Sequence, residues 1–168
     1  MNLQPSRARL SPGAVAALLA AVKLAVHALT LRPYGFFRDE LYYIACSERL
    51  AWGYVDQPPF SIVVLRVWRY LWGDSLAALR LLPALVGAAT VLIAGYIAIE
   101  LGGRRLAVAL TGLGVLAAGQ YLGTAHYYSM NVWDQLFWTL AGYLVLRAVG
   151  RGSPRDWIAL GLALGIGL

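Results

Sequence analysis

The sequence predicts an all-α integral membrane protein, with about four complete transmembrane helices, a truncated fifth and two short interfacial helices in the first outer loop. Of its 168 residues, 60% are hydrophobic and 13% are charged, whereas a soluble domain has about 45–50% apolar and about 25% charged residues. The apolar residues also gather in long runs that short basic turns separate. This pattern is typical of a chain that crosses a bilayer several times.

Five apolar runs give the predicted transmembrane helices, at residues 13–31, 78–101, 105–122, 132–149 and 157–168. The last run has about 12 residues, and at 1.5 Å per residue it reaches about 18 Å, short of the roughly 30 Å of hydrocarbon in a bilayer. We therefore expect residues 1–168 to be the N-terminal part of a larger polytopic domain, and this fragment alone to be inactive.

The first run begins at Ser11-Pro12, which is a helix-start signal. A basic segment before an apolar run also occurs in cleaved signal peptides, and Val26-His27-Ala28 would be a cleavage site. The run has the length of a full span, about 18–20 residues, which favours a membrane helix. Lys23 and His27 are four residues apart and share one helix face, so we expect both side chains to point inward, to protein or water.

The positive charges predict the orientation. They gather at the N-terminus and in two further turns, at Arg104-Arg105 and at Arg147, Arg151 and Arg155. By the positive-inside rule these segments are cytoplasmic, so the loop at 33–75 and the turn at 123–131 face the periplasm or exterior of an inner, cytoplasmic membrane. The net charge of +6 is scattered rather than gathered in a stripe, which points to lipid headgroups and excludes nucleic acid as a partner.

The outer loop is the most polar part of the chain, with five of its eight acidic residues. It contains two predicted short helices, at 39–52 and 58–72, and we expect the second to lie in the headgroup plane because it is apolar, aromatic and too short to span. Several aromatic residues fit an interfacial belt; they are Trp52, Trp68, Tyr70, Trp72 and the pair Tyr42-Tyr43. The single cysteine, Cys46, is predicted to be a small packing residue.

Asp39 and Glu40 stand in the first turn of the predicted helix at 39–52. There the helix dipole favours a carboxylate by about 0.3–1 kcal/mol, so the pair has a structural explanation, with Arg38 as its partner. Adjacent helical side chains diverge by about 100°, and the two carboxylates therefore cannot form one paired site. One of them at the water–lipid boundary could instead act as a general base. The charge pattern leaves both interpretations open.

Four short motifs carry a resemblance to a known family. They are RDELYY at 38–43, LAWGYVDQPP at 50–59, GDS at 73–75 and LRLLPA at 79–84. With this order and spacing, the chain resembles the N-terminal part of the GT-C membrane glycosyltransferases, among them the protein O-mannosyltransferases and the lipid A aminoarabinose transferases. The resemblance implies a polyprenyl-phosphate-linked sugar donor, inverting transfer at the outer leaflet, and an acceptor hydroxyl or phosphate on a protein, lipid or glycan.

The resemblance also implies roles for individual residues. Asp39 takes the position of the catalytic base, and Glu40 completes the acid pair. Asp56 corresponds to a metal ligand of the aminoarabinose enzymes, so the one cofactor implied is a divalent metal. Gln57 stands where those enzymes have a lysine that meets the donor phosphate, and it can hydrogen-bond but cannot neutralise charge. Asp134 matches a second acid near the active centre, although an N-cap or first-turn aspartate would explain it equally well.

The remaining candidates would bind substrate. Arg38 and Arg80 could meet the donor phosphate, since a guanidinium offers two parallel hydrogen bonds to phosphate oxygens. Tyr43, His126 and Asn131 could line the substrate groove; the turn at 123–131 also holds Tyr127 and Tyr128. Each of these residues could equally be an interfacial anchor.

A small membrane transporter or a non-catalytic membrane scaffold is the alternative function. Lys23 and His27 within the first span and the glycine-rich helices favour it. A transporter, however, is expected to place its polar groups near the bilayer midplane, often in repeated halves. Here the acids gather in a loop and the sequence shows no repeat, so we favour the glycosyltransferase.

Overall fold

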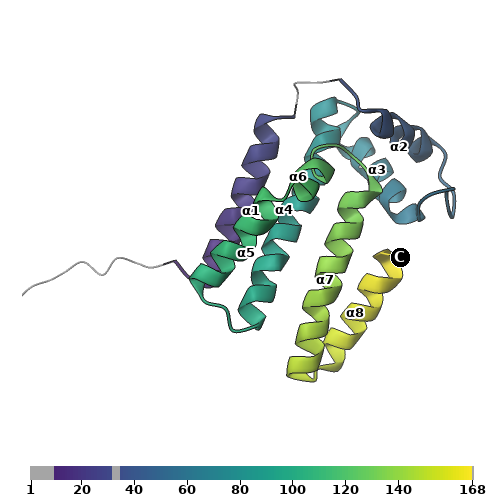
Figure 1. Cartoon of the computed structure of the whole chain (residues 1–168). Helices are drawn as coiled ribbons and strands as arrows, with labels where there is room; N and C mark the ends of the chain where they lie inside the picture. The colour runs from purple at the N-terminus through teal and green to yellow at the C-terminus, as the bar shows by residue number, and fades with distance from the viewer. Residues whose placement is uncertain (1–9, 32–34, 168) are drawn as a thin grey trace, which may run out of the picture.

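The structure is a computed structural model that describes residues 10–31 and 35–167, and this part of the chain folds into eight helices with no strand (Figure 1). The helices are α1 Pro12–Leu29, α2 Arg38–Glu48, α3 Pro59–Trp72, α4 Leu76–Glu100, α5 Arg105–Ala117, α6 Gly119–Thr124, α7 Met130–Arg151 and α8 Pro154–Gly167. The basic N-terminal residues Arg7 and Arg9, the beginning of the outer loop at 33–34 and residue 168 lie outside the described residues.

The long helices form two groups joined through α4. Helix α1 packs along α4 and α5, while α7 packs against α4 on one side and α8 on the other (Figure 1). Small residues let the backbones approach: a Cβ at Gly95 would come within 2.6 Å of Cβ of Ala16, and one at Gly112 within 2.5 Å of Leu19. Such contacts suit helices that lipid does not drive together.

Two described helices, α1 and α4, are long and apolar enough to cross a membrane, and α5 is a shorter apolar helix. The all-helical fold and the helices predicted at 13–31, 78–101 and 132–149 are confirmed, with ends that differ by up to two residues. Ser11 caps α1 as expected, since its hydroxyl accepts a hydrogen bond from the amide of Ala14 at 3.1 Å. The number of spans, about four, stays a prediction.

The single helix predicted at 105–122 was wrong, because the chain breaks at Ala118 into α5 and α6. Ala118 has an extended backbone with φ −70° and ψ 119°. The end of α6 is held from α1: the Lys23 ammonium donates to the carbonyl of Tyr121 at 2.7 Å, one of the last four carbonyls of α6, which lack partners within a helix. The polar turn predicted at 123–131 is accordingly shorter, because α6 ends at Thr124 and α7 begins at Met130.

Lys23 and His27 both point inward, as predicted, and both side chains are buried. The His27 ring lies 6.1 Å from the ring of His126, measured between centroids. Lys23 therefore has a structural role at the α6 end, and this role accounts for a charge that had favoured the transporter interpretation.

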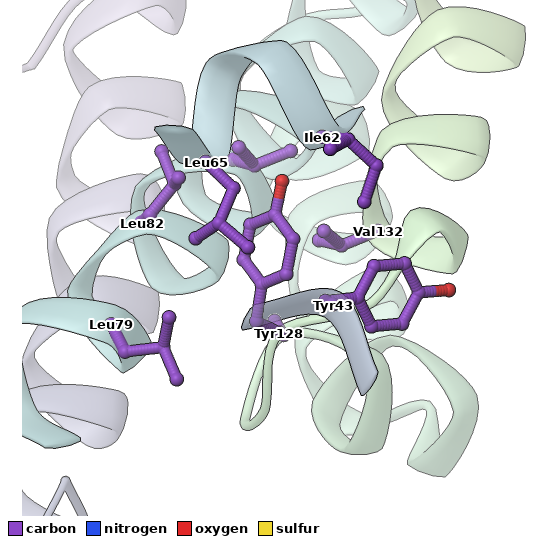
Figure 2. Close-up of a cluster of buried hydrophobic side chains, with 9 residues drawn as sticks. Tyr43, Ile62, Leu65, Leu79, Leu82, Tyr128 and Val132 are labelled. Atoms are coloured by element: carbon purple, nitrogen blue, oxygen red, sulfur yellow. The ribbon is translucent and has the colours of Figure 1, made fainter. Parts of the chain in front are cut away.

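Helices α2 and α3 lie across the end of the bundle where α4 and α7 begin (Figure 1). Helices occupy both predicted segments of the outer loop, although α2 ends at Glu48 and not at residue 52; that they are interfacial helices stays a prediction. Beneath them a buried cluster joins α2, α3, α4 and α7 (Figure 2); its labelled members are Tyr43, Ile62, Leu65, Leu79, Leu82, Tyr128 and Val132.

Two aromatic residues assigned to an interfacial belt lie elsewhere. Tyr43 is in the buried cluster, edge-on to Tyr128 with 5.6 Å between ring centroids. Trp68 is half-buried, and its indole N–H donates to the carbonyl of Ala78 at 2.7 Å. Trp52, Tyr70 and Trp72 are exposed, and their place at a membrane surface stays a prediction.

Candidate active site

Glu40 and Arg80 form a buried ion pair that fixes the start of α2 to the start of α4. Nη2 of Arg80 lies 3.0 Å from Oε2 of Glu40, and Nε lies 3.1 Å from Oε1. The side chains are 0% and 3% exposed. Arg80 also donates to the carbonyls of Leu31 and Gly35. Two parallel bonds of this kind hold a carboxylate in one orientation.

The carboxylate of Glu40 accepts two backbone hydrogen bonds in addition. One comes from the amide of Phe37, immediately before α2, at 2.8 Å. The other comes from the amide of Tyr128, in the turn before α7, at 3.3 Å. Glu40 thus joins three segments that are far apart in the sequence, and its surroundings make it an anchor for the fold.

Asp39 has the opposite environment. Its side chain is 37% exposed, and its contact with Nε of Arg38, at 3.2 Å, involves an arginine that is 89% exposed. Both acids lie in the first turn of α2, as predicted, and they diverge as adjacent helical residues must. Of the two carboxylates, Asp39 is therefore the one that a substrate could reach.

Tyr43, one turn after Asp39, connects α2 to the beginning of α7. Burial raises the pKa of Tyr43, a hydrogen bond with the backbone of Met130 lowers it, and the negative charges of Asp56 and Asp39 raise it further. The negative charges of Asp56 and Asp39 thus act on the same tyrosine hydroxyl. Tyr43 is buried, so it supports this region from beneath.

Asp56 lies in the exposed loop before α3 and accepts a hydrogen bond from the hydroxyl of Tyr42 at 2.7 Å. That bond raises the pKa of Tyr42. Within residues 10–31 and 35–167, no three His, Cys, Asp or Glu side chains come together in a way that could hold a metal ion. A metal needs several ligands, so this part of the chain does not supply a complete site, and Asp56 as a ligand stays a prediction.

Gln57 is buried, and neither polar atom of its side-chain amide has a hydrogen-bond partner among the described residues.

The next residue, Pro58, lines two cavities. The larger, of about 670 Å³, is mainly apolar and lies between the loop before α3 and the end of α8; Leu50, Trp52, Phe60, Val63 and Ile166 line it. The smaller, of about 310 Å³, includes Asn131 and Asp134.

Asp134 is exposed on the second turn of α7, and α7 has no acidic residue in its first turn. The N-cap of α7 is Ser129, so the explanation of Asp134 as an N-cap or first-turn acid was wrong. The carboxylate and the side chain of Asn131, which is also exposed, border the same cavity. The structure brings together these two candidates, while Asp39 lines neither of the two cavities.

His126 lies near the ion pair rather than near this cavity. Burial lowers the pKa of His126, the positive charge of Arg80 lowers it further, and Glu40 opposes this effect. Its Nδ1 is 3.5 Å from the hydroxyl of Thr30. Tyr128, in the same turn, is fully buried, and burial raises its pKa; its place in the core makes it a support of the site.

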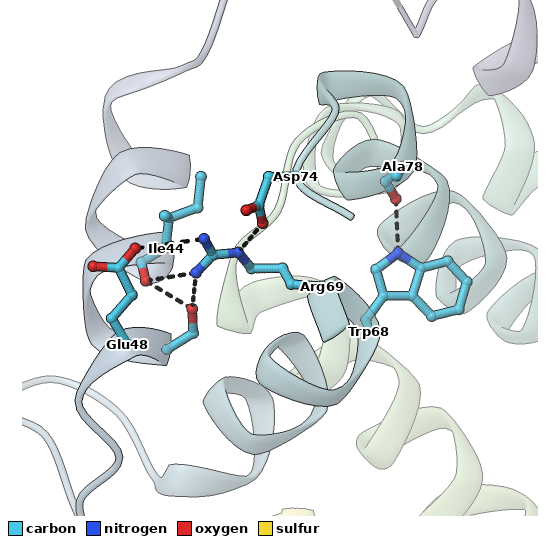
Figure 3. Close-up of polar contacts among 7 residues, drawn as sticks. Ile44, Glu48, Trp68, Arg69, Asp74 and Ala78 are labelled. Carbon is cyan, nitrogen blue, oxygen red and sulfur yellow. Dashed lines mark hydrogen bonds and ion pairs between the residues drawn. The ribbon is translucent and has the colours of Figure 1, made fainter. Parts of the chain in front are cut away.

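One important residue, Arg69, was missed from sequence (Figure 3). Its guanidinium, on α3, donates to the carbonyl of Ile44 at 3.2 Å and to the hydroxyl of Ser47 at 2.6 Å, both near the end of α2. Nε of Arg69 contacts Asp74 at 2.5 Å. In a helix predicted to lie in the headgroup plane, nothing distinguished the role of Arg69 from that of Arg66. The only signal in the sequence was an opposite charge, Asp74, five residues later.

The chain matches the family described as dolichyl-phosphate-mannose-protein mannosyltransferase over residues 56–168. The match begins at Asp56, so it includes Asp134 but not the RDELYY motif. No curated protein and no solved structure matches the chain. The match covers more than half of the sequence and confirms the resemblance: the chain belongs to the dolichyl-phosphate-mannose-protein mannosyltransferase family.

Proposed function

We propose that this protein transfers a sugar from a polyprenyl-phosphate-linked donor to an acceptor at the outer face of the cytoplasmic membrane, with Asp39 as the general base. Family membership supports a glycosyltransferase over a transporter or a scaffold. The observation that carries the choice of base is the contrast within the acid pair: Glu40 is buried against Arg80, whereas Asp39 remains accessible.

The proposed reaction is a single displacement. The Asp39 carboxylate accepts the proton of the acceptor O–H while that oxygen attacks the anomeric carbon from the face opposite the lipid phosphate. The new C–O bond forms as the bond from the anomeric carbon to the phosphate oxygen breaks, and polyprenyl phosphate leaves with the electron pair. Inversion at the anomeric carbon follows. These steps use only residues of this chain, and none passes through the metal for which Asp56 is the candidate ligand.

Arg38 is the better candidate of the two arginines for meeting the donor phosphate. Its side chain is largely exposed and adjoins Asp39, whereas the donors of Arg80 face Glu40 and backbone carbonyls. Gln57 could donate a hydrogen bond to the donor substrate, since its side-chain amide has no partner among the described residues. Asp134 would orient a substrate hydroxyl.

The test is sugar transfer by membranes that carry the full-length protein, with radiolabelled polyprenyl-phosphate sugars as donors. We expect Asp39→Asn to lower kcat by about 10²–10⁴-fold, which is the usual contribution of general base catalysis. Glu48→Gln is the matched control, because Glu48 is an exposed acid on the same helix, and it should change turnover little. Equal turnover of Asp39→Asn and the wild type would eliminate this base.

A further inference from the structure

The smaller cavity lies where α3 and α7 begin and α8 ends, and it has a volume of about 310 Å³. This is at the lower end of the range of about 300–1,000 Å³ for small-molecule pockets. The cavity therefore suits a ligand of the size of one ring rather than a long-chain lipid. Its lining mixes aromatic residues with three polar ones, Ser61, Asn131 and Asp134, a combination typical of sites that orient a small polar ligand.

Ser61 is the least expected member of this lining. It is 3% exposed, and its hydroxyl has no hydrogen-bond partner among the described residues. Its carbonyl, in contrast, accepts a bond from the hydroxyl of Tyr128 at 2.5 Å. Buried polar side chains nearly always have a partner, and an exception calls for an explanation. A ligand in the cavity would supply that partner.

The aromatic wall of the cavity is held in a fixed position. The indole N–H of Trp133 donates to the hydroxyl of Tyr128 at 3.1 Å. Phe60 stands nearly perpendicular to Trp133, with 5.2 Å between ring centroids, and it packs in the same manner on Phe137. Such edge-to-face pairs stabilise one arrangement of the rings, so the wall is shaped before any ligand binds.

We propose that this cavity binds the pyranose ring of a sugar substrate. The apolar C–H face of the ring would lie on the aromatic wall, and its hydroxyls would donate to Asp134 and exchange hydrogen bonds with Asn131 and Ser61. Carboxylate, amide and hydroxyl groups together offer acceptors and donors to a set of ring hydroxyls. This inference rests on the proposed function, because a glycosyltransferase needs a place for the ring.

The cavity is also linked to the helix that carries the proposed base. Met130 lines it and packs against the buried cluster that contains Tyr43, which lies one turn after Asp39 on α2. The buried cluster therefore connects the cavity to the helix that carries Asp39. The ring belongs either to the donor sugar or to an acceptor glycan, and the experiment distinguishes these sources.

The experiment compares two buried serines in the full-length protein, with methyl α-D-mannopyranoside and methyl α-D-glucopyranoside as probes in saturation-transfer NMR. Ser61 and Ser129 are both buried with hydroxyls that lack partners in the described chain, but only Ser61 lines the cavity. We expect Ser61→Ala and Asn131→Ala each to weaken probe binding by about 2- to 12-fold, the loss of one hydrogen bond, and Ser129→Ala to leave it unchanged.

Competition identifies the source of the ring. Displacement of the probe by a polyprenyl-phosphate sugar, but not by polyprenyl phosphate alone, assigns the cavity to the donor sugar, and displacement by neither assigns it to an acceptor glycan.

No saturation of either probe, or equal effects of Ser61→Ala and Ser129→Ala, would overturn the proposal. Asp39→Asn should still bind the probe. If that variant transfers sugar as fast as the wild type while binding is retained, the proposed base fails and this site stands.

Discussion

An arginine holds each end of α2, but the two arginines lie in different surroundings. At the beginning of the helix, Arg80 and Glu40 form an ion pair from which solvent is excluded. At its end, Arg69 is mostly buried, while its carboxylate partners, Glu48 and Asp74, are 59% and 67% exposed. The buried bonds of Arg69 go instead to the neutral oxygens of Ile44 and Ser47 (Figure 3).

The difference concerns how strictly each end is fixed. A buried ion pair contributes little net stability over an apolar pair, but loss of one partner leaves a desolvated charge, so alternative positions of the helix are strongly disfavoured. An ion pair with exposed carboxylates contributes little and salt screens it. The beginning of α2, which carries the proposed base, is thus the end whose position is specified most strictly.

The largest effect is expected for Glu40→Gln. This change removes the charge that neutralises Arg80 while keeping the shape of the side chain, and we expect it to lower the free energy of unfolding by about 3–5 kcal/mol. Thermal unfolding of the full-length protein in detergent would measure it. Without the ion pair the beginning of α2 would shift, and Asp39 with it, so sugar transfer should fall together with stability.

A double variant sharpens this prediction. Glu40→Leu combined with Arg80→Met removes both charges. The free energy of unfolding should then fall by less than the sum of the decreases in the two single variants, because no buried charge remains without its counterpart. Additive losses would mean that the two residues stabilise the protein independently, and the comparison between the ends of α2 would then lose its basis.

Much of the fold could be predicted because apolar runs and helix caps are local signals. The ends of α1, α4 and α7 came within two residues of those predicted, and the first-turn position of Asp39 and Glu40 was correct. The break at Ala118 was not predicted from the apolar run, and the bond that Lys23 donates to Tyr121 near the end of α6, from 98 residues away in the sequence, exists only in the folded structure.

The site was less accessible to sequence reasoning for the same reason. Charge pattern identified Asp39 and Glu40 as a pair but not which one would be buried, because that depends on Arg80, 40 residues away in the sequence. Tyr43 was taken for an interfacial residue because nothing local distinguishes it from Tyr42. Its packing against Tyr128 and the rest of the buried cluster is a property of the folded structure. Ser61 carried no sequence signal, since its unpartnered hydroxyl is a property of the folded structure.

A smaller effect is expected for Arg69→Met. The variant loses the hydrogen bonds to Ile44 and Ser47, and bonds that involve a charged group contribute about 1.5–3 kcal/mol. We expect unfolding measurements to show a loss in this range, less than that of Glu40→Gln. Arg69→Lys is the control: it restores the charge but not the planar fork, so it should recover only part of the loss. A loss that equals that of Glu40→Gln would show that both ends of α2 are fixed equally strictly.

The smallest effect is expected for Asp74→Asn, and it depends on pH. The hydrogen bond from Arg69 holds the pKa of Asp74 below its usual value. The folded state therefore binds the proton of Asp74 less readily than the unfolded state, so the carboxylate stabilises the fold above the unfolded pKa, about 3.9. At pH 7 the variant should lose about 0.2–1 kcal/mol, as exposed ion pairs do. The gap in Tm between wild type and variant should narrow as the pH falls below about 4. Thermal unfolding between pH 3 and 7 would measure the gap, and one that widens toward low pH would contradict the ion pair with Arg69.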